Sequence, residues 1–193
     1  MIRITTLLAA AAAVVALPAS AAAQAPPQLQ PLHAGDYWIY QAQSISGETQ
    51  QHVVRVTDVA GGWYRVDGHP IVGDAWMAHT AGSVVYFAGA VLVVLDGSAT
   101  VGSSWTCAAS PYDVTLTLLS TSAAVSTPAG GFANALFYGA VTAAADAGLT
   151  SLVVAPGVGI VKYTTLTTAG ALTYRLLRAR VDGVDYPRPQ VSR

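Results

Sequence analysis

From residue 36 onward, hydrophobic and polar residues mostly alternate one by one, and short Gly-containing segments separate the alternating runs. Successive side chains of a β-strand point to opposite faces, so this pattern is typical of strands that bury one face. The clearest run covers residues 113–119 (DVTLTLL), where valine and leucines share one face and threonines the other. Only residues 127–134 and 143–146 could hold a helical turn. The pattern therefore predicts an all-β chain.

The alternation predicts about ten to twelve short strands joined mostly by tight turns. They fall at residues 36–44, 51–59, 63–66, 71–79, 84–87, 91–95, 113–119, 135–142, 149–154, 160–168 and 171–181. Residues 96–104 read as a loop, with Trp105 anchoring its end in the core. Successive hairpins favour an antiparallel meander that forms a curved sheet, a half-barrel or a barrel-like sandwich.

The first 23 residues have the features of a signal peptide. Arg3 supplies a positive charge, residues 4–17 form an apolar run, and small residues end at Ala23, where we expect cleavage. The run is too short for a stable membrane span, and a retained signal anchor is the competing interpretation. The chain then divides into a flexible linker (24–34), one β domain (35–183) and a flexible tail (184–193). A periplasmic or secreted protein follows from this organisation.

Charge and cysteine content narrow the classes of partner. The chain has 9 Lys and Arg against 10 Asp and Glu, for a net charge of −1. Binding of nucleic acid needs a clustered basic surface, so we expect no such partner. No later segment is long enough to span a membrane as a helix. Cys107 is the single cysteine, and we expect a buried, inert thiol, with intermolecular pairing or reactivity as alternatives.

Two segments differ from ordinary strand-and-turn sequence. Residues 127–136 (TPAGGFANAL) combine a Pro-started turn with a glycine suited to positive φ and an aromatic residue expected in the core. Residues 155–163 (APGVGIVKY) begin with a type II turn signature and a glycine that permits a bulge or a close backbone approach. The residues that carry these features are Pro128, Gly130, Phe132, Pro156, Gly157 and Gly159.

Together with residues 35–40 (GDYWIY), these motifs resemble a family of uncharacterised bacterial exported proteins. That family has a G-(D/N)-Y-W-x-Y strand, then T-P-A-G-T-F, then A-P-G-V-G-L-V-K. This chain departs from the pattern at Gly131, which replaces a threonine, and at Val153 and Val154, which replace an aromatic pair. The resemblance implies an all-β envelope protein and no particular activity.

The sequence offers weak candidates for catalysis. His69 and His79 could converge with Asp67 or Asp74 on a metal ion, but the usual ligand spacing is missing, so we expect neither metal nor cofactor. A hydrolase site built from His69, Asp74 and His79 is an alternative. No G-x-S-x-G elbow occurs. The Gly157-x-Gly159 segment precedes a strand pattern instead of a helix, which argues against a phosphate loop.

Aromatic residues concentrate in the first half of the chain, often as adjacent pairs. Adjacent residues of a strand cannot both face the core, so one member of each pair lies on the other face, where an aromatic surface suits an apolar or carbohydrate ligand. The candidate ligand-binding residues are Trp38, Tyr40, Trp63, Trp76 and Tyr86. We therefore expect a non-enzymatic exported domain that binds a hydrophobic small molecule or an envelope protein. A purely structural role is a further alternative.

Overall fold

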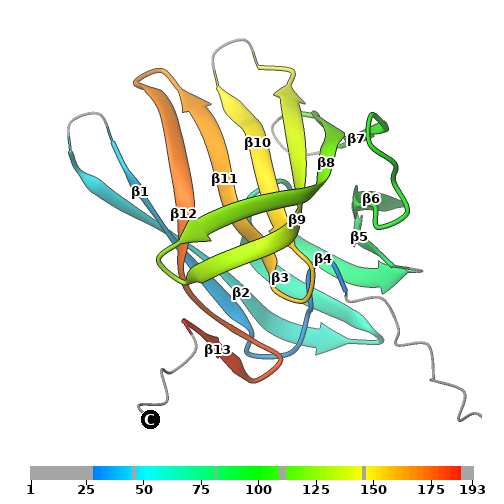
Figure 1. Ribbon diagram of the computed structural model, residues 1–193. Coiled ribbons are helices and arrows are strands. Elements are labelled where there is room, and N and C mark those ends of the chain that lie inside the picture. Colours follow the sequence, from blue (N-terminus) through cyan, green and yellow to red (C-terminus); the bar gives the residue numbers. More distant parts are fainter. Residues whose placement is uncertain (1–27, 45–46, 81, 109–111, 145–146, 188–193) are drawn as a thin grey trace, which may run out of the picture.

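The computed structural model describes residues 28–44, 47–80, 82–108, 112–144 and 147–187, and within them it contains strands and no helix (Figure 1). The predicted signal peptide, residues 1–23, lies outside the described residues. The strands are β1 (Tyr37–Gln43), β2 (Thr49–Ala60), β3 (Trp63–His69), β4 (Gly73–Thr80), β5 (Ser83–Phe87), β6 (Val91–Leu95), β7 (Ser104–Cys107), β8 (Val114–Thr127), β9 (Gly130–Thr142), β10 (Gly148–Ala155), β11 (Gly159–Thr167), β12 (Gly170–Val181) and β13 (Val184–Tyr186).

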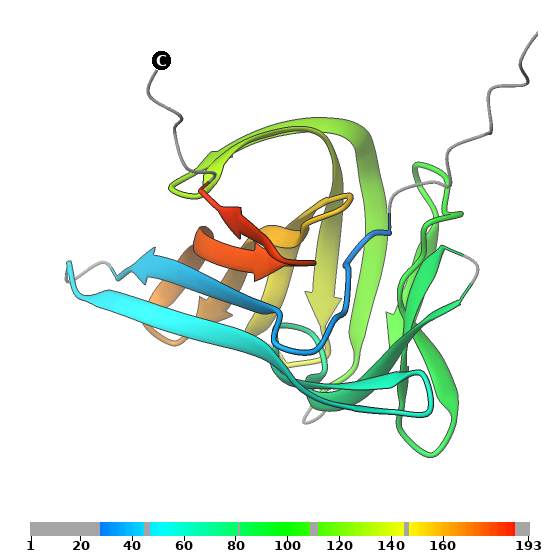
Figure 2. The ribbon, with the colours of Figure 1, turned by 90° about the horizontal axis from the view of Figure 1, so that it is seen from below.

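All strands belong to one antiparallel sheet in the order β6-β5-β4-β3-β2-β1-β12-β11-β10-β9-β8-β7, and β13 pairs with β12. Two meanders, β1 to β6 and β7 to β12, are thus joined by pairing of β1 with β12. The sheet curls until its edge strands β6 and β7 approach each other, which gives a nearly closed barrel (Figure 2). The prediction of a barrel-like antiparallel meander is confirmed.

Side chains, instead of a backbone ladder, bridge the seam between β6 and β7. The indole Nε1 of Trp105 donates to the carbonyl oxygen of Val94 at 3.2 Å, and the thiol of Cys107 donates to that of Val93 at 3.2 Å. Cys107 is fully buried, and burial raises the pKa of its thiol to about 12. The thiol therefore stays protonated at neutral pH, and its predicted burial is confirmed. The sequence missed β7 because four residues are too few to show alternation.

Residues 127–134, which could have held a helical turn, instead contain the β-hairpin turn that joins β8 to β9. Both strands extend further than the alternation predicts, and their hairpin arches across one end of the barrel (Figure 2). Their pairing is interrupted by three register shifts between Leu118 and Val125. Each bulge resets which residues face inward, so this part of β8 does not alternate. Residues 143–144 are not helical, and 145–146 lie outside the described residues.

The predicted linker is corrected where the structure describes it. Leu29, Gln30, Pro31 and Leu32 are buried, and the two leucines belong to the hydrophobic core. It is also held by a hydrogen bond from the Gly157 N–H to the Gln28 carbonyl oxygen at 2.7 Å. A composition rich in Pro and Gln obscured these apolar contacts. At the other end of the chain, the predicted tail begins with a paired strand, β13.

Gly68 allows the end of β3 to turn into the barrel. Its φ is +75°, and a Cβ added there would lie 2.5 Å from the carbonyl oxygen of Val53. We predict that Gly68→Ala lowers the free energy of unfolding by at least about 3 kcal/mol, because left-handed strain adds to a backbone clash. Gly62→Ala is the matched control, with φ +83° and open space around it, and should cost only about 1 kcal/mol. Equal costs in urea denaturation would contradict this explanation.

Candidate functional site

The inner wall of the barrel continues beyond the packed core at one open end, between the β1–β2 and β11–β12 hairpins. A depression of about 640 Å³ lies there, and a neighbouring depression of about 340 Å³ shares Thr165 and Tyr174 with it. We call the two together the mouth site. It is lined by Ser44, Gln50, His52, Gly68, His69, Pro70, Gly73, Tyr163, Thr165, Thr167, Ala169, Leu172 and Tyr174.

Strand register explains why side chains far apart in sequence meet at the mouth site. Tyr40 of β1 lies opposite His52 of β2, and Tyr163 of β11 lies opposite Tyr174 of β12. Tyr40 is fully buried in the core. Because residues two apart along a strand share a face, the inward rows of β1, β2, β11 and β12 pass from the core into the site.

The rings of His52, Tyr163 and Tyr174 form the floor of the mouth site, and the buried Tyr40 packs beneath them. Tyr163 and Tyr174 stack with centroids 4.8 Å apart, and Tyr40 meets Tyr163 edge-on at 5.2 Å. The hydroxyl of Tyr163 is hydrogen-bonded to Nδ1 of His52, and that of Tyr174 donates to Oε1 of Gln50 at 3.0 Å. The rings are thus fixed by packing and hydrogen bonds together, as expected for a preorganised binding surface.

Burial determines the protonation states of His52 and Tyr163 at the floor of the site. Burial lowers the pKa of His52, and burial with the nearby Tyr174 raises the pKa of Tyr163 well above its ordinary value. At neutral pH the His52 imidazole and the Tyr163 hydroxyl are therefore both uncharged, and one hydrogen bond joins them. None of the described residues that line the site is Asp, Glu, Lys or Arg. The site offers ring faces and neutral hydrogen-bonding groups.

The five predicted ligand residues do not form one site. Trp38, Tyr40 and Tyr86 are buried in the core, at exposures of 0, 1 and 3 %, so the prediction of a shared surface is corrected. Trp63 and Trp76 lie on the outer face and remain partly exposed. The sequence correctly required some aromatic residues to face outward, but alternation within one strand does not tell which side of the sheet the core occupies.

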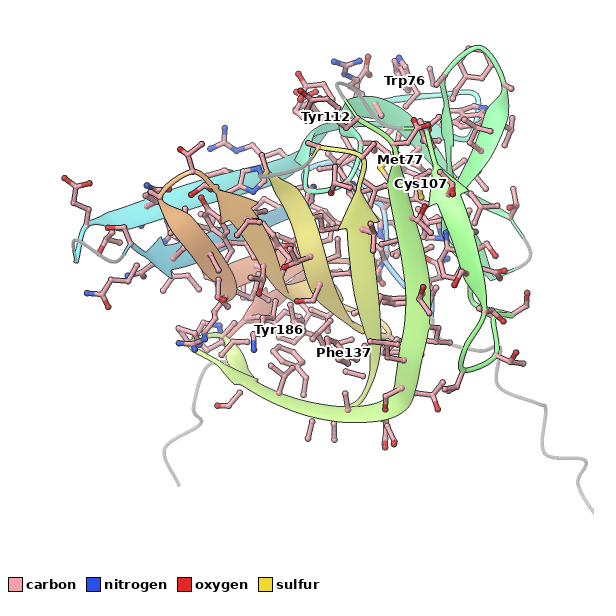
Figure 3. The ribbon with its side chains drawn as sticks, turned by 90° about the horizontal axis from the view of Figure 1, so that it is seen from above. Trp76, Met77, Cys107, Tyr112, Phe137 and Tyr186 are labelled. Atoms are coloured by element: carbon pink, nitrogen blue, oxygen red, sulfur yellow. The ribbon has the colours of Figure 1, made fainter. Side chains whose placement is uncertain are left out.

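The two outward tryptophans belong to a shallow apolar depression of about 390 Å³, which we call the outer ledge. It is lined by Ala60, Trp63, Trp76, Phe87 and Val91. The Trp63 and Phe87 rings meet edge to face, with centroids 6.2 Å apart. Met77, next to Trp76 in β4, is fully buried on the opposite face (Figure 3). The ledge is an exposed surface, whereas the mouth site is part of the inner wall.

The sequence motifs meet each other in the structure. The indole Nε1 of Trp38 donates to the carbonyl oxygen of Val158 at 2.6 Å, and the hydroxyl of Tyr40 donates to that of Ile160 at 2.8 Å. Gly159 lies between these two acceptors, and its φ of +101° is in the region that favours glycine; an added Cβ would also lie 3.0 Å from Cγ of Gln30. The opening strand motif therefore holds the A-P-G-V-G turn in place.

The T-P-A-G-G-F turn lies beside the same A-P-G-V-G turn. Together with Tyr186 and Pro187 they border a depression of about 740 Å³. Phe132 is half-buried instead of lying in the core, and its ring centroid is 6.3 Å from that of Tyr186. The prediction that Phe132 is buried in the core is thus only partly correct. Its ring packs against β13, a strand that the sequence pattern did not predict. Pro128, Pro156 and Gly157 lie in turns as predicted, and Gly130, the first residue of β9, has a positive φ of 137°.

The residues of the alternative hydrolase site have separate partners. His69 is buried and hydrogen-bonded to Gln30, Asp74 accepts from the Gly68 N–H and pairs with Arg65, and His79 shares no hydrogen bond with either. No group of three or more His, Cys, Asp or Glu within the described residues could hold a metal ion. The structure does not assemble these side chains into a site.

The fold and the mouth site define a class: a nearly closed antiparallel β-barrel with an uncharged aromatic depression at one open end. No family model matches the chain, and no curated protein matches it. A crystal structure from Parabacteroides distasonis, of a protein described provisionally as a lipoprotein, is similar over 81 % of this chain and 100 % of that chain. The identity is 12 % and the TM-score 0.45, so the likeness carries no argument about function. Among the described residues, no helix is both long and apolar enough to cross a membrane.

Proposed function

We propose that this protein is an exported, non-enzymatic binding domain that holds a small uncharged ligand in the mouth site. The observation that supports this proposal is the pair of adjoining depressions on the inner wall, floored by fixed aromatic rings and lined by no charged side chain among the described residues. Ligand sites are typically concave, mainly apolar and supplied with a few placed polar groups, and the mouths of β-barrels are a preferred place for them.

The lining specifies the chemistry of the ligand. Leu172 and the ring of Tyr174 offer apolar contact, whereas Gln50 and Thr165 offer neutral donors and acceptors. An ionised ligand would lose hydration without gaining a counter-charge. A neutral molecule with an apolar part and hydroxyl or amide groups fits best. The signal-peptide pattern supports a ligand met in the cell envelope.

The test uses Nile red, a neutral dye whose emission responds to an apolar environment. Leu172→Arg places a charge in the mouth site, and we predict that it weakens dye binding at least tenfold, since the guanidinium finds no partner there. Val91→Arg makes the same change on the outer ledge and should leave that binding within about twofold. Fluorescence titration gives both dissociation constants, and near-UV circular dichroism checks the fold.

Two outcomes contradict the proposal. If Leu172→Arg binds the dye as tightly as the natural chain, the mouth site is not the binding site. If Val91→Arg alone abolishes binding, the outer ledge is the site instead.

A further inference from the structure

A second surface, on the outside of the barrel, carries an unusual concentration of positive charge. Of the six described Lys and Arg residues, five project from the outer face of β2, β12 and β11, and β1 lies between β2 and β12 in the sheet. We call this surface the basic face. Its cations are Arg55, Lys162, Arg175, Arg178 and Arg180.

Strand register places these side chains side by side. Tyr37, in the middle of the face, lies opposite Arg55 on one neighbouring strand and Arg180 on the other. Ile39 lies opposite Arg178 on β12. Between these outward residues of β1, Trp38 and Tyr40 are buried on the inner face. The arginines are therefore separated by partly exposed apolar and aromatic side chains.

The face continues onto β11, where Lys162 lies opposite Arg175. All four arginines of the face are exposed, and none of its five cations has a carboxylate within 4.0 Å among the described residues. The remaining described arginine, Arg65, differs: its Nε lies 2.9 Å from Asp67. Among the described strand residues, only two acidic residues are paired in register with a cation of the basic face. Asp67 of β3 lies opposite Arg55, and Asp185 of β13 lies opposite Arg180.

We propose that the basic face binds the surface of an anionic membrane. Clusters of four to eight Lys and Arg residues are typical of surfaces that attract anionic lipid headgroups, and tyrosine is enriched at the level of the headgroups. None of the four depressions described above is lined by a cation of this face, which favours an extended partner over a small anion. Because the whole chain carries a net charge of −1, the rest of the surface is repelled, so this face would be turned to the membrane.

Co-sedimentation with lipid vesicles tests the proposal on the processed chain. We expect binding to phosphatidylcholine vesicles that contain roughly 30 % phosphatidylglycerol, at least tenfold tighter than to phosphatidylcholine alone. Raising the salt from about 0.1 to about 0.5 M should abolish it. The variant Arg175→Gln/Arg178→Gln/Arg180→Gln should bind these vesicles more than tenfold more weakly, since each cation near an anionic surface raises the binding constant about fivefold.

Single substitutions distinguish the contribution of the basic face to vesicle binding from that of the protein's net charge. Arg178→Gln and Arg65→Gln remove the same charge, but Arg65 is held by Asp67 and Asp74, so only Arg178→Gln should weaken binding severalfold. Equal effects of the two, or equal binding to neutral and anionic vesicles, would overturn the proposal. Binding to heparin with no binding to vesicles would also overturn it and assign the face to an anionic polysaccharide. The mouth site plays no part in these measurements.

Discussion

Replacing Trp38 by alanine is expected to lower the free energy of unfolding by about 3–5 kcal/mol, the range for removing a fully buried large aromatic side chain. Trp38 has 0 % exposure, and its indole donates to the carbonyl oxygen of Val158. The substitution therefore leaves a cavity and an unsatisfied buried carbonyl oxygen together. It also disconnects β1 from the turn before β11. Urea denaturation monitored by far-UV circular dichroism measures the loss.

Two control variants separate these contributions. Trp38→Phe keeps an aromatic ring but removes the N–H, and should cost less than Trp38→Ala, about 1–3 kcal/mol. Trp63→Ala removes an indole from the outer ledge, where it is partly exposed, and should cost less than about 1.5 kcal/mol. If Trp38→Ala and Trp63→Ala cost the same, the buried hydrogen-bonded tryptophan does not hold the two motifs together.

Strand positions could be predicted because hydrophobic and polar residues alternate with a period of two along most strands. Residues 114–119 and 171–176 alternate clearly, and both fall within strands, β8 and β12. Prediction failed where that period was interrupted or too brief: at the bulges of β8, in the four residues of β7 and in the three of β13. The segment around Leu29 was missed for another reason, because it is buried without belonging to a strand.

The mouth site could not be predicted, because its floor depends on pairing between distant strands. His52 and Tyr163 are 111 residues apart, and each alone reads as an ordinary strand residue. Pairing of β1 with β12, which joins the two meanders, brings them together, and alternation carries no information about that pairing. The basic face was hidden for a similar reason. The arginines of residues 175–180 (RLLRAR) were visible, but Arg55 joins them only through β1.

Acid should destabilise the protein through His69, the second large effect that we predict. His69 is 2 % exposed, and burial, with a smaller effect of the nearby His52, lowers its pKa to about 3. Its hydrogen bonds agree with a neutral ring: Nδ1 accepts from the Ile71 N–H at 3.3 Å, and Nε2 faces Oε1 of Gln30 at 3.2 Å. In the unfolded chain the same ring takes up a proton below its ordinary pKa of 6.5.

The unfolded state therefore binds the extra proton between about pH 6.5 and 3, so the stabilising contribution of neutral His69 is complete above 6.5 and falls as pH decreases. Two pH units below 6.5 should remove about 2–3 kcal/mol. The lowered pKa values of His52 and His79 act in the same direction, whereas the raised pKa of Asp36 opposes them at lower pH.

The variant His69→Gln isolates this contribution, because glutamine can still donate toward Gln30 but does not titrate. Its unfolding free energy at pH 7 should be lower than that of the natural chain, since the acceptor for the Ile71 N–H is lost. Between about pH 6.5 and 4.5, however, its stability should fall by about 1.4 kcal/mol less per pH unit. Urea denaturation across this range compares the two slopes. Identical slopes would mean that His69 takes up its proton in the folded state, which contradicts the close packing of Gln30 and the β3–β4 turn around the ring.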